Sequence, residues 1–135
     1  MEGNSKILVA SDNEVFYKPC ITYFESLGIS IDRKDDGLAA LNSVKSETYE
    51  FIIAEIQLTY LNGLHLCKFI KNDGRFKHIP FILVLELGTS EEMLKARRAG
   101  ADYSVTMPVD LNILKDNVIN LLYSQRDEEG IANAA

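Results

Sequence analysis

The sequence predicts a single α/β domain in which helices cover both faces of a five-stranded parallel sheet. Short apolar runs alternate with amphipathic segments of helical period along most of the 135 residues. The runs are apolar throughout, which is typical of strands buried on both faces of a sheet. The length suits one domain with one hydrophobic core.

The first half of the chain contains three strand-like runs. Residues 6–10 form the first, and Ser11 with Glu14 makes a capping-box pattern before a helix at 14–27. Pro19 lies inside this helix, so the helix is expected to kink or to start late. Gly28 ends it. The elements that follow are a short strand at 29–31, a helix at 37–46 and a strand at 51–54 that ends at Glu55.

The second half repeats the pattern twice. A helix at 64–72 precedes the most hydrophobic run, 80–85. Thr89 and Glu92 form a capping box for a helix that ends near Gly100. The last strand is expected at 103–106, and Asp110 caps a helix to about Tyr123. We therefore expect the domain to span 1–124, followed by a polar, frayed tail or linker at 125–135.

Composition and charge narrow the classes of function. The net charge is −6, and an acidic surface repels a polyanion, so we expect no nucleic-acid partner. The sequence has no signal peptide or membrane span, which favours the cytoplasm. Cys20 and Cys67 lie far apart and form no CxxC motif, so a zinc site is not expected.

Five strand–helix units with right-handed crossovers leave few topologies, and the flavodoxin-like order 2-1-3-4-5 is the commonest. In this order the first and third helices lie on opposite faces, which excludes a Cys20–Cys67 disulfide. The ligand crevice lies beyond the carboxyl ends of the strands. The residues that fall on that edge are 11–13, 55–58, 85–87 and 107.

Six short segments in this order resemble the response-regulator receiver domain of two-component signalling, over about residues 5–124. They are Lys6–Asp12, Asp36-Gly37, Leu61–Leu64, His78–Pro80, Ala99–Asp102 and Met107–Asp110. The resemblance implies an aspartate phosphoacceptor that ends the third strand, with Mg²⁺ held by carboxylates after the first. It also implies a hydroxyl that ends the fourth strand, a lysine that ends the fifth, and a switch aromatic on the fifth.

This chain departs from the receiver pattern at nearly every one of these positions. Glu55 stands at the acceptor position, and the acidic pair is reduced to Ser11-Asp12. The remaining substituted positions are Leu85 for the hydroxyl, Met107 for the lysine, Ser104 for the aromatic and Thr59 for the usual loop proline. Tyr103 is next to Ser104 but should face the other way, because strand side chains alternate.

Several interpretations stay open for the remnant pocket of Ser11, Asp12, Glu55 and Gln57. Glu55 is a phosphoryl mimic, a metal ligand or a solvated carboxylate, and Asp12 is a helix cap or a ligand. For two neighbouring carboxylates without a cation, either one should hold its proton more tightly or the pair should take up a cation. With the Gln57 carbonyl they offer at most a weak Mg²⁺ site, and we expect no other cofactor. Leu85 and Met107 are interpreted as packing that closes the pocket.

We interpret the chain as a degenerate pseudo-receiver that is not an enzyme and acts by binding a protein partner. The expected partner or homodimer surface is formed by the fourth helix, fifth strand and fifth helix, with Lys95, Arg98, Tyr103 and Asp110. His65 and His78 are expected at the surface. One alternative is a phosphorylatable receiver with an atypical acceptor. Another is a small-molecule or nucleotide binder in the same crevice, although no Gly-rich phosphate loop supports it.

Overall fold

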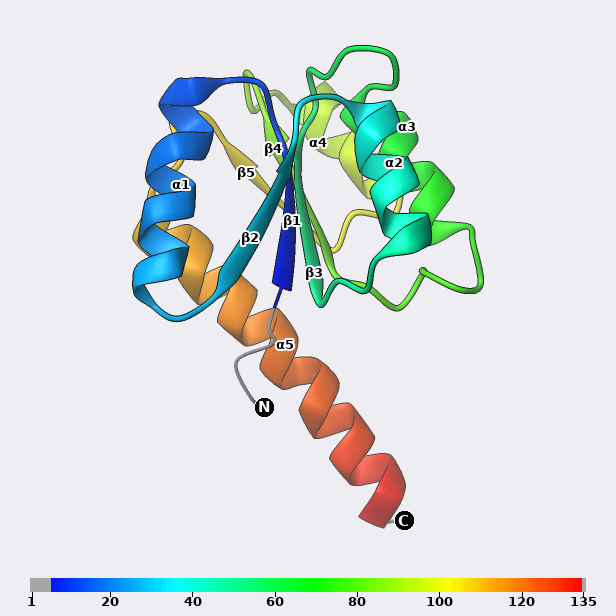
Figure 1. The fold of residues 1–135 in the computed structure, drawn as a ribbon. Coiled ribbons are helices and arrows are strands. Elements are labelled where there is room, and N and C mark those ends of the chain that lie inside the picture. Colours follow the sequence, from blue (N-terminus) through cyan, green and yellow to red (C-terminus); the bar gives the residue numbers. More distant parts are fainter. Residues whose placement is uncertain (1–5, 135) are drawn as a thin grey trace.

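The computed structural model describes residues 6–134, with side chains described as far as Tyr123. Its sheet has five parallel strands in the order β2-β1-β3-β4-β5, which confirms the predicted fold and topology (Figure 1). The strands are β1 Lys6–Ala10, β2 Ser30–Lys34, β3 Phe51–Glu55, β4 Phe81–Leu85 and β5 Tyr103–Thr106.

Helices cover both faces of this sheet. α1 and α5 lie on one face, and α2, α3 and α4 lie on the other (Figure 1). The helices are α1 Glu14–Ser26, α2 Gly37–Ser46, α3 Gly63–Lys71, α4 Ser90–Arg98 and α5 Leu111–Ala134. None of the described helices is both long and apolar enough to cross a membrane.

The sheet separates two hydrophobic clusters. Alternate residues of the central strands β1, β3 and β4 enter opposite clusters, so Ile7 and Val9 pack beneath α1 and α5 while Leu8 packs beneath the other three helices. Cys20 belongs to the first cluster and Cys67 to the second, and both are buried free thiols. The prediction that they form no disulfide is therefore confirmed.

Close backbone packing places the start of α3 against the end of β3. The amide of Gly63 donates to the Ile56 carbonyl at 3.0 Å. A Cβ atom at residue 63 would collide with the carbonyl oxygen of Glu55. Only glycine allows the helix to begin here, directly beside the carboxyl end of the central strand.

Two predicted boundaries are wrong, while α1 begins at Glu14 as predicted. It does not start late but continues through Pro19, whose exposed ring faces away from the core. β2 continues to Lys34 because it pairs with all of β1. α5 continues past Tyr123 to Ala134, because Gln, Arg, Glu and Ala favour helix and no proline intervenes.

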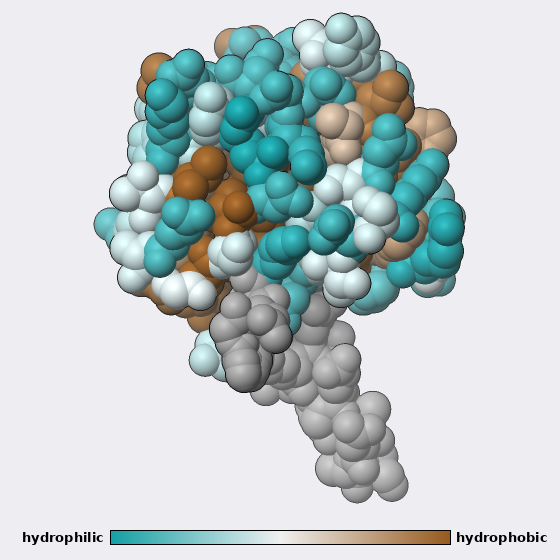
Figure 2. Space-filling model, in the orientation of Figure 1, coloured by the Kyte–Doolittle hydropathy of each residue, from teal (hydrophilic) through white to brown (hydrophobic). Residues whose placement is uncertain are grey.

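The surface agrees with the acidic, polar composition. Figure 2 shows one side of the molecule as mostly hydrophilic, with a hydrophobic area between α1 and the edge strand β2. The long α5 helix projects beyond the amino edge of the sheet, away from the carboxyl ends of the strands (Figure 1). The use of residues 125–135 as a linker stays a prediction.

Candidate functional site

The carboxyl ends of the strands surround a cavity of about 420 Å³. The pairing register aligns the carboxyl ends of β3, β4 and β5, since Glu55 pairs with Val84 and Leu85 pairs with Thr106. Seven of the residues predicted at this edge line the cavity: Asn13, Glu55, Ile56, Gln57, Leu85, Glu86 and Met107. Parallel strands therefore bring together the positions that the sequence singled out.

Ser11 and Glu55 form the polar centre of the site. Ser11 is fully buried, and its hydroxyl donates a short hydrogen bond to Oε2 of Glu55. The amide of Asn13 donates to the Ser11 hydroxyl oxygen at 3.1 Å. The predicted capping box of Ser11 with Glu14 is wrong, because the hydroxyl faces the crevice. Sequence reasoning placed Ser11 in the pocket but did not foresee this bond.

Asn13, and not Asp12, caps α1. Its side-chain oxygen accepts a hydrogen bond from the amide of Val15 at 3.1 Å. Asp12 is exposed and is not one of the residues that line the cavity. The interpretation of Asp12 as the cap is wrong by one residue, because Asn is an equally good cap and lies directly before the first helical turn.

The pKa of Glu55 is raised above its ordinary value. Burial is the main cause, since it penalises the charged form, and the negative charges of Asp12 and Glu86 add to it. Hydrogen bonds from Ser11 and Asn13 oppose the rise without cancelling it. The prediction that one carboxyl of the pocket holds its proton more tightly is confirmed for Glu55, with burial ahead of Asp12 as the cause.

Glu92 holds the loop between β4 and α4. Its carboxylate accepts hydrogen bonds from the amides of Leu87 at 2.9 Å and Gly88 at 2.7 Å. Its own amide donates to the Thr89 hydroxyl at 3.1 Å, as the predicted capping box requires. Burial raises the pKa of Glu92, but the backbone donors outweigh it and the pKa is lowered. This anchored loop forms one rim of the crevice.

The predicted partner surface is exposed, but its residues have different roles. Tyr103 is half exposed and shares a cavity of about 350 Å³ with Met93 and Ser104. Arg98 is exposed, and Lys95 forms an ion pair with Glu91 at 3.4 Å. Asp110 caps α5 by accepting from the amide of Asn112 at 2.9 Å, so its role is structural.

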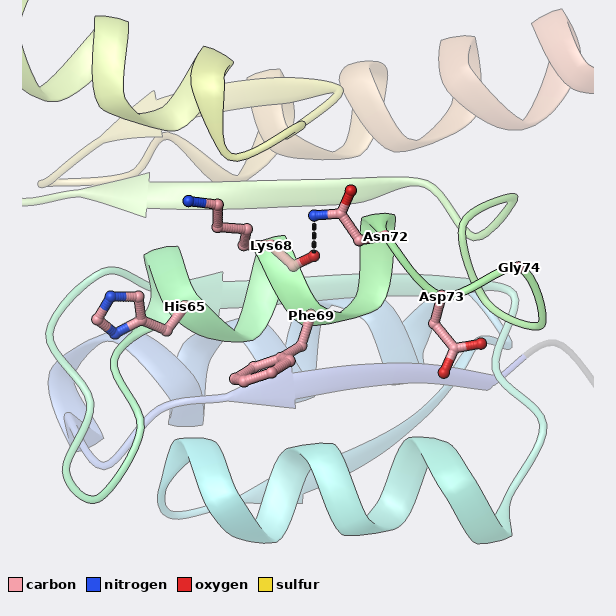
Figure 3. Close-up of a pocket in the computed structure, with 6 residues that line it drawn as sticks. All are labelled: His65, Lys68, Phe69, Asn72, Asp73 and Gly74. Atoms are coloured by element: carbon pink, nitrogen blue, oxygen red, sulfur yellow. Dashed lines mark hydrogen bonds between the residues drawn. The ribbon is translucent and has the colours of Figure 1, made fainter.

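A larger cavity of about 630 Å³ lies on the outer surface of α3, away from the crevice. Figure 3 shows Phe69 on the side of α3 that faces α2, with Lys68 on the opposite side. The Asn72 amide group donates to the Lys68 carbonyl at 2.8 Å. His65, at the start of this cavity, is exposed, and so is His78, which confirms both as surface residues.

Comparison with known proteins identifies the family. Residues 7–119 match the family described as the response regulator receiver domain. The chain belongs to this family. The receiver is 26% identical over 119 residues to chemotaxis protein CheY-3 of Vibrio cholerae, covering 87% of this chain and 92% of that protein. It is therefore a receiver domain of two-component signalling.

Two further matches agree. The receiver is 31% identical over 119 residues to the Regulator of RpoS of Escherichia coli, covering 87% of this chain and 35% of that protein. It superposes on the receiver domain of the Francisella response regulator 1452 with a TM-score of 0.83 at 27% identity, covering 90% of this chain and 99% of that one. Both matches span most of the receiver.

The crevice of this receiver is a poor fit for a Mg²⁺ ion. Mg²⁺ prefers several oxygen ligands in octahedral geometry. Among the described residues, no three His, Cys, Asp or Glu side chains come close enough to share a metal ion. The carboxyl of Glu55 is hydrogen-bonded to Ser11, and Leu85 and Met107 add apolar surface that penalises a hydrated ion.

Proposed function

We propose that this chain is a phosphorylation-independent receiver that regulates signalling by binding another protein. The observation that carries the proposal is the crevice itself. Glu55, at the position of the acceptor, is hydrogen-bonded to buried Ser11, while Leu85 and Met107 offer a phosphoryl group neither a hydroxyl nor a cation. Phosphoryl transfer depends on positioned charges around the phosphoryl oxygens, and these side chains do not supply them.

The rest of the proposal follows from the loss of that chemistry. The domain has no enzymatic activity of its own and acts in the cytoplasm. It needs no cofactor, and Mg²⁺ at Asp12 and Glu55 binds weakly, on the order of millimolar or poorer. Glu55 is not a phosphoryl mimic, since its hydrogen-bonding partner is Ser11 of the domain's own core.

The partner surface is the exposed region around Tyr103. Tyr103 and Met93 offer apolar area, and Arg97 and Arg98 offer positive charge beside it. A large aromatic with a neighbouring arginine is a common centre of protein interfaces. The same surface is available for a second copy of the chain.

The decisive experiment is incubation with phosphoramidate and Mg²⁺, followed by intact-mass spectrometry and sedimentation velocity. We expect no adduct of about 80 Da, the mass of one phosphoryl group, and no change in sedimentation. The matched control carries Ser11→Asp, Glu55→Asp, Leu85→Thr and Met107→Lys, which restore the charges that the transfer requires. An adduct on the natural protein that Glu55→Gln abolishes would overturn the proposal.

A further inference from the structure

The crevice has apolar walls and charges of one sign. Val15, Met107 and Pro108 contribute hydrophobic surface from α1 and the segment after β5, and Leu85 at the end of β4 is fully buried. The ionisable residues that line the cavity are Glu55 and Glu86, and Asp12 adds its negative charge to theirs. Among the described residues that line it, none is a Lys, Arg or His.

The carboxyl of Glu55 is fixed at the wall of this cavity. Glu55 is only 8% exposed, and a hydrogen bond from the buried Ser11 hydroxyl holds its carboxyl in place. This donor is neutral, so it orients the negative charge without compensating it. A buried carboxylate in this position is stabilised by any cation that can reach it without a full hydration shell.

We propose that the cavity binds a primary alkylammonium group, with the ammonium on Glu55 and the alkyl chain against Val15, Met107 and Pro108. Mg²⁺ keeps several waters, which apolar walls do not accept. An anion meets like charge, and a neutral hydrocarbon leaves the carboxyl uncompensated. A cavity of about 420 Å³ accommodates a short aliphatic amine. This inference goes beyond the protein-binding function, and neither depends on the other.

The probe is n-butylammonium, titrated into the isotope-labelled protein while amide NMR shifts are followed. We expect shifts at the ends of β3 and β4 and near Met107. The neutral isostere n-butanol should bind about tenfold more weakly, because a charge-assisted hydrogen bond to Glu55 distinguishes the two. Affinity should fall as the pH falls through the pKa of Glu55, which burial and the negative charges of Asp12 and Glu86 raise.

Two variants and one control test the assignment. Glu55→Gln should weaken n-butylammonium binding about tenfold, and exposed Glu50→Gln should not change it. Met107→Lys places a tethered ammonium in the wall beside Glu55 and should compete with the ligand to a similar extent. Equal affinity for butanol and butylammonium, or unchanged binding by Glu55→Gln, would overturn the proposal.

A second ligand distinguishes the source of the amine. Nα-acetyl-lysine methylamide presents the same ammonium on a peptide-like backbone. If it binds as well as n-butylammonium, the group is supplied by a lysine of a protein partner. If only n-butylammonium binds, the ligand is a free amine. Binding of neither overturns the inference, while the phosphoramidate result for the function proposed above is unaffected.

Discussion

Glu55 sits in a place where the folded domain penalises its charge. Burial and the neighbouring charges of Asp12 and Glu86 raise its pKa, so the native state binds the proton more tightly than the unfolded chain does. For a carboxyl whose folded pKa is raised, stability is greatest when it is protonated. Stability falls as pH rises from the unfolded pKa to the folded pKa, and the penalty persists above it.

Glu55→Gln should therefore stabilise the domain at neutral pH. Gln keeps an oxygen that accepts from Ser11 but carries no charge, and we expect a gain of about 1 kcal/mol in the free energy of unfolding. Urea unfolding between about pH 4 and pH 8 measures this gain and the loss of the pH-dependent decline. Glu50→Gln, at an exposed carboxyl, is the matched control. A variant less stable than the natural protein at neutral pH would show that the hydrogen bond outweighs the buried charge.

At the scale of elements, the start of α3 reaches the carboxyl edge of the sheet through a close backbone contact. Gly63 lies where a side chain would meet the backbone of Glu55 and Ile56, whereas Gly74, in the turn after α3, has open space around it. The shape of the crevice depends on the contact at Gly63, because this contact holds the start of α3 directly beside the end of β3.

Gly63→Ala should destabilise the domain by about 2–3 kcal/mol, because backbone atoms cannot rotate away as a side chain can. Gly74→Ala should change stability by less than about 0.5 kcal/mol. Denaturant unfolding of both variants gives the comparison. Near-neutral behaviour of Gly63→Ala would show that α3 can shift away from β3, and amide NMR shifts at Glu55 would then report the movement.

The pattern of apolar residues was sufficient to predict the helices and strands, but not to predict where they end or which side chains contact each other. The apolar runs place β1, β3, β4 and β5 within about a residue, and parallel strands then bring Glu55, Leu85 and Met107 to one edge. The Ser11–Glu55 bond depends on how two side chains turn inside a filled interior. The reach of Glu92 to the amides of Leu87 and Gly88 depends on how the loop curls. Neither has a periodic signature.

On the scale of the whole molecule, one sheet separates two hydrophobic clusters, and a buried thiol lies in each. Burial raises the pKa of Cys20 and of Cys67 to about 12, so neither thiol is reactive while the surrounding layer stays closed. Strand residues such as Leu8 and Val9 alternate between the two clusters. Because the three central strands β1, β3 and β4 contribute to both clusters, the layers should open together.

We therefore expect both thiols to be labelled only through global unfolding. The variants Cys67→Ala and Cys20→Ala each leave one thiol to report, and labelling at about pH 8 under native conditions gives its free energy of opening. In each variant this free energy of opening should equal the free energy of unfolding that urea denaturation gives for the same variant. Because both values come from one variant, any destabilisation by the substitution affects them equally. The reporter thiols lie in α1 for one variant and α3 for the other. If Cys67 opened at a clearly lower free energy than global unfolding while Cys20 did not, the layer of α2, α3 and α4 would be a separate unit of lower stability. A cooperative domain predicts agreement at both sites, since the strands that close one cluster also close the other.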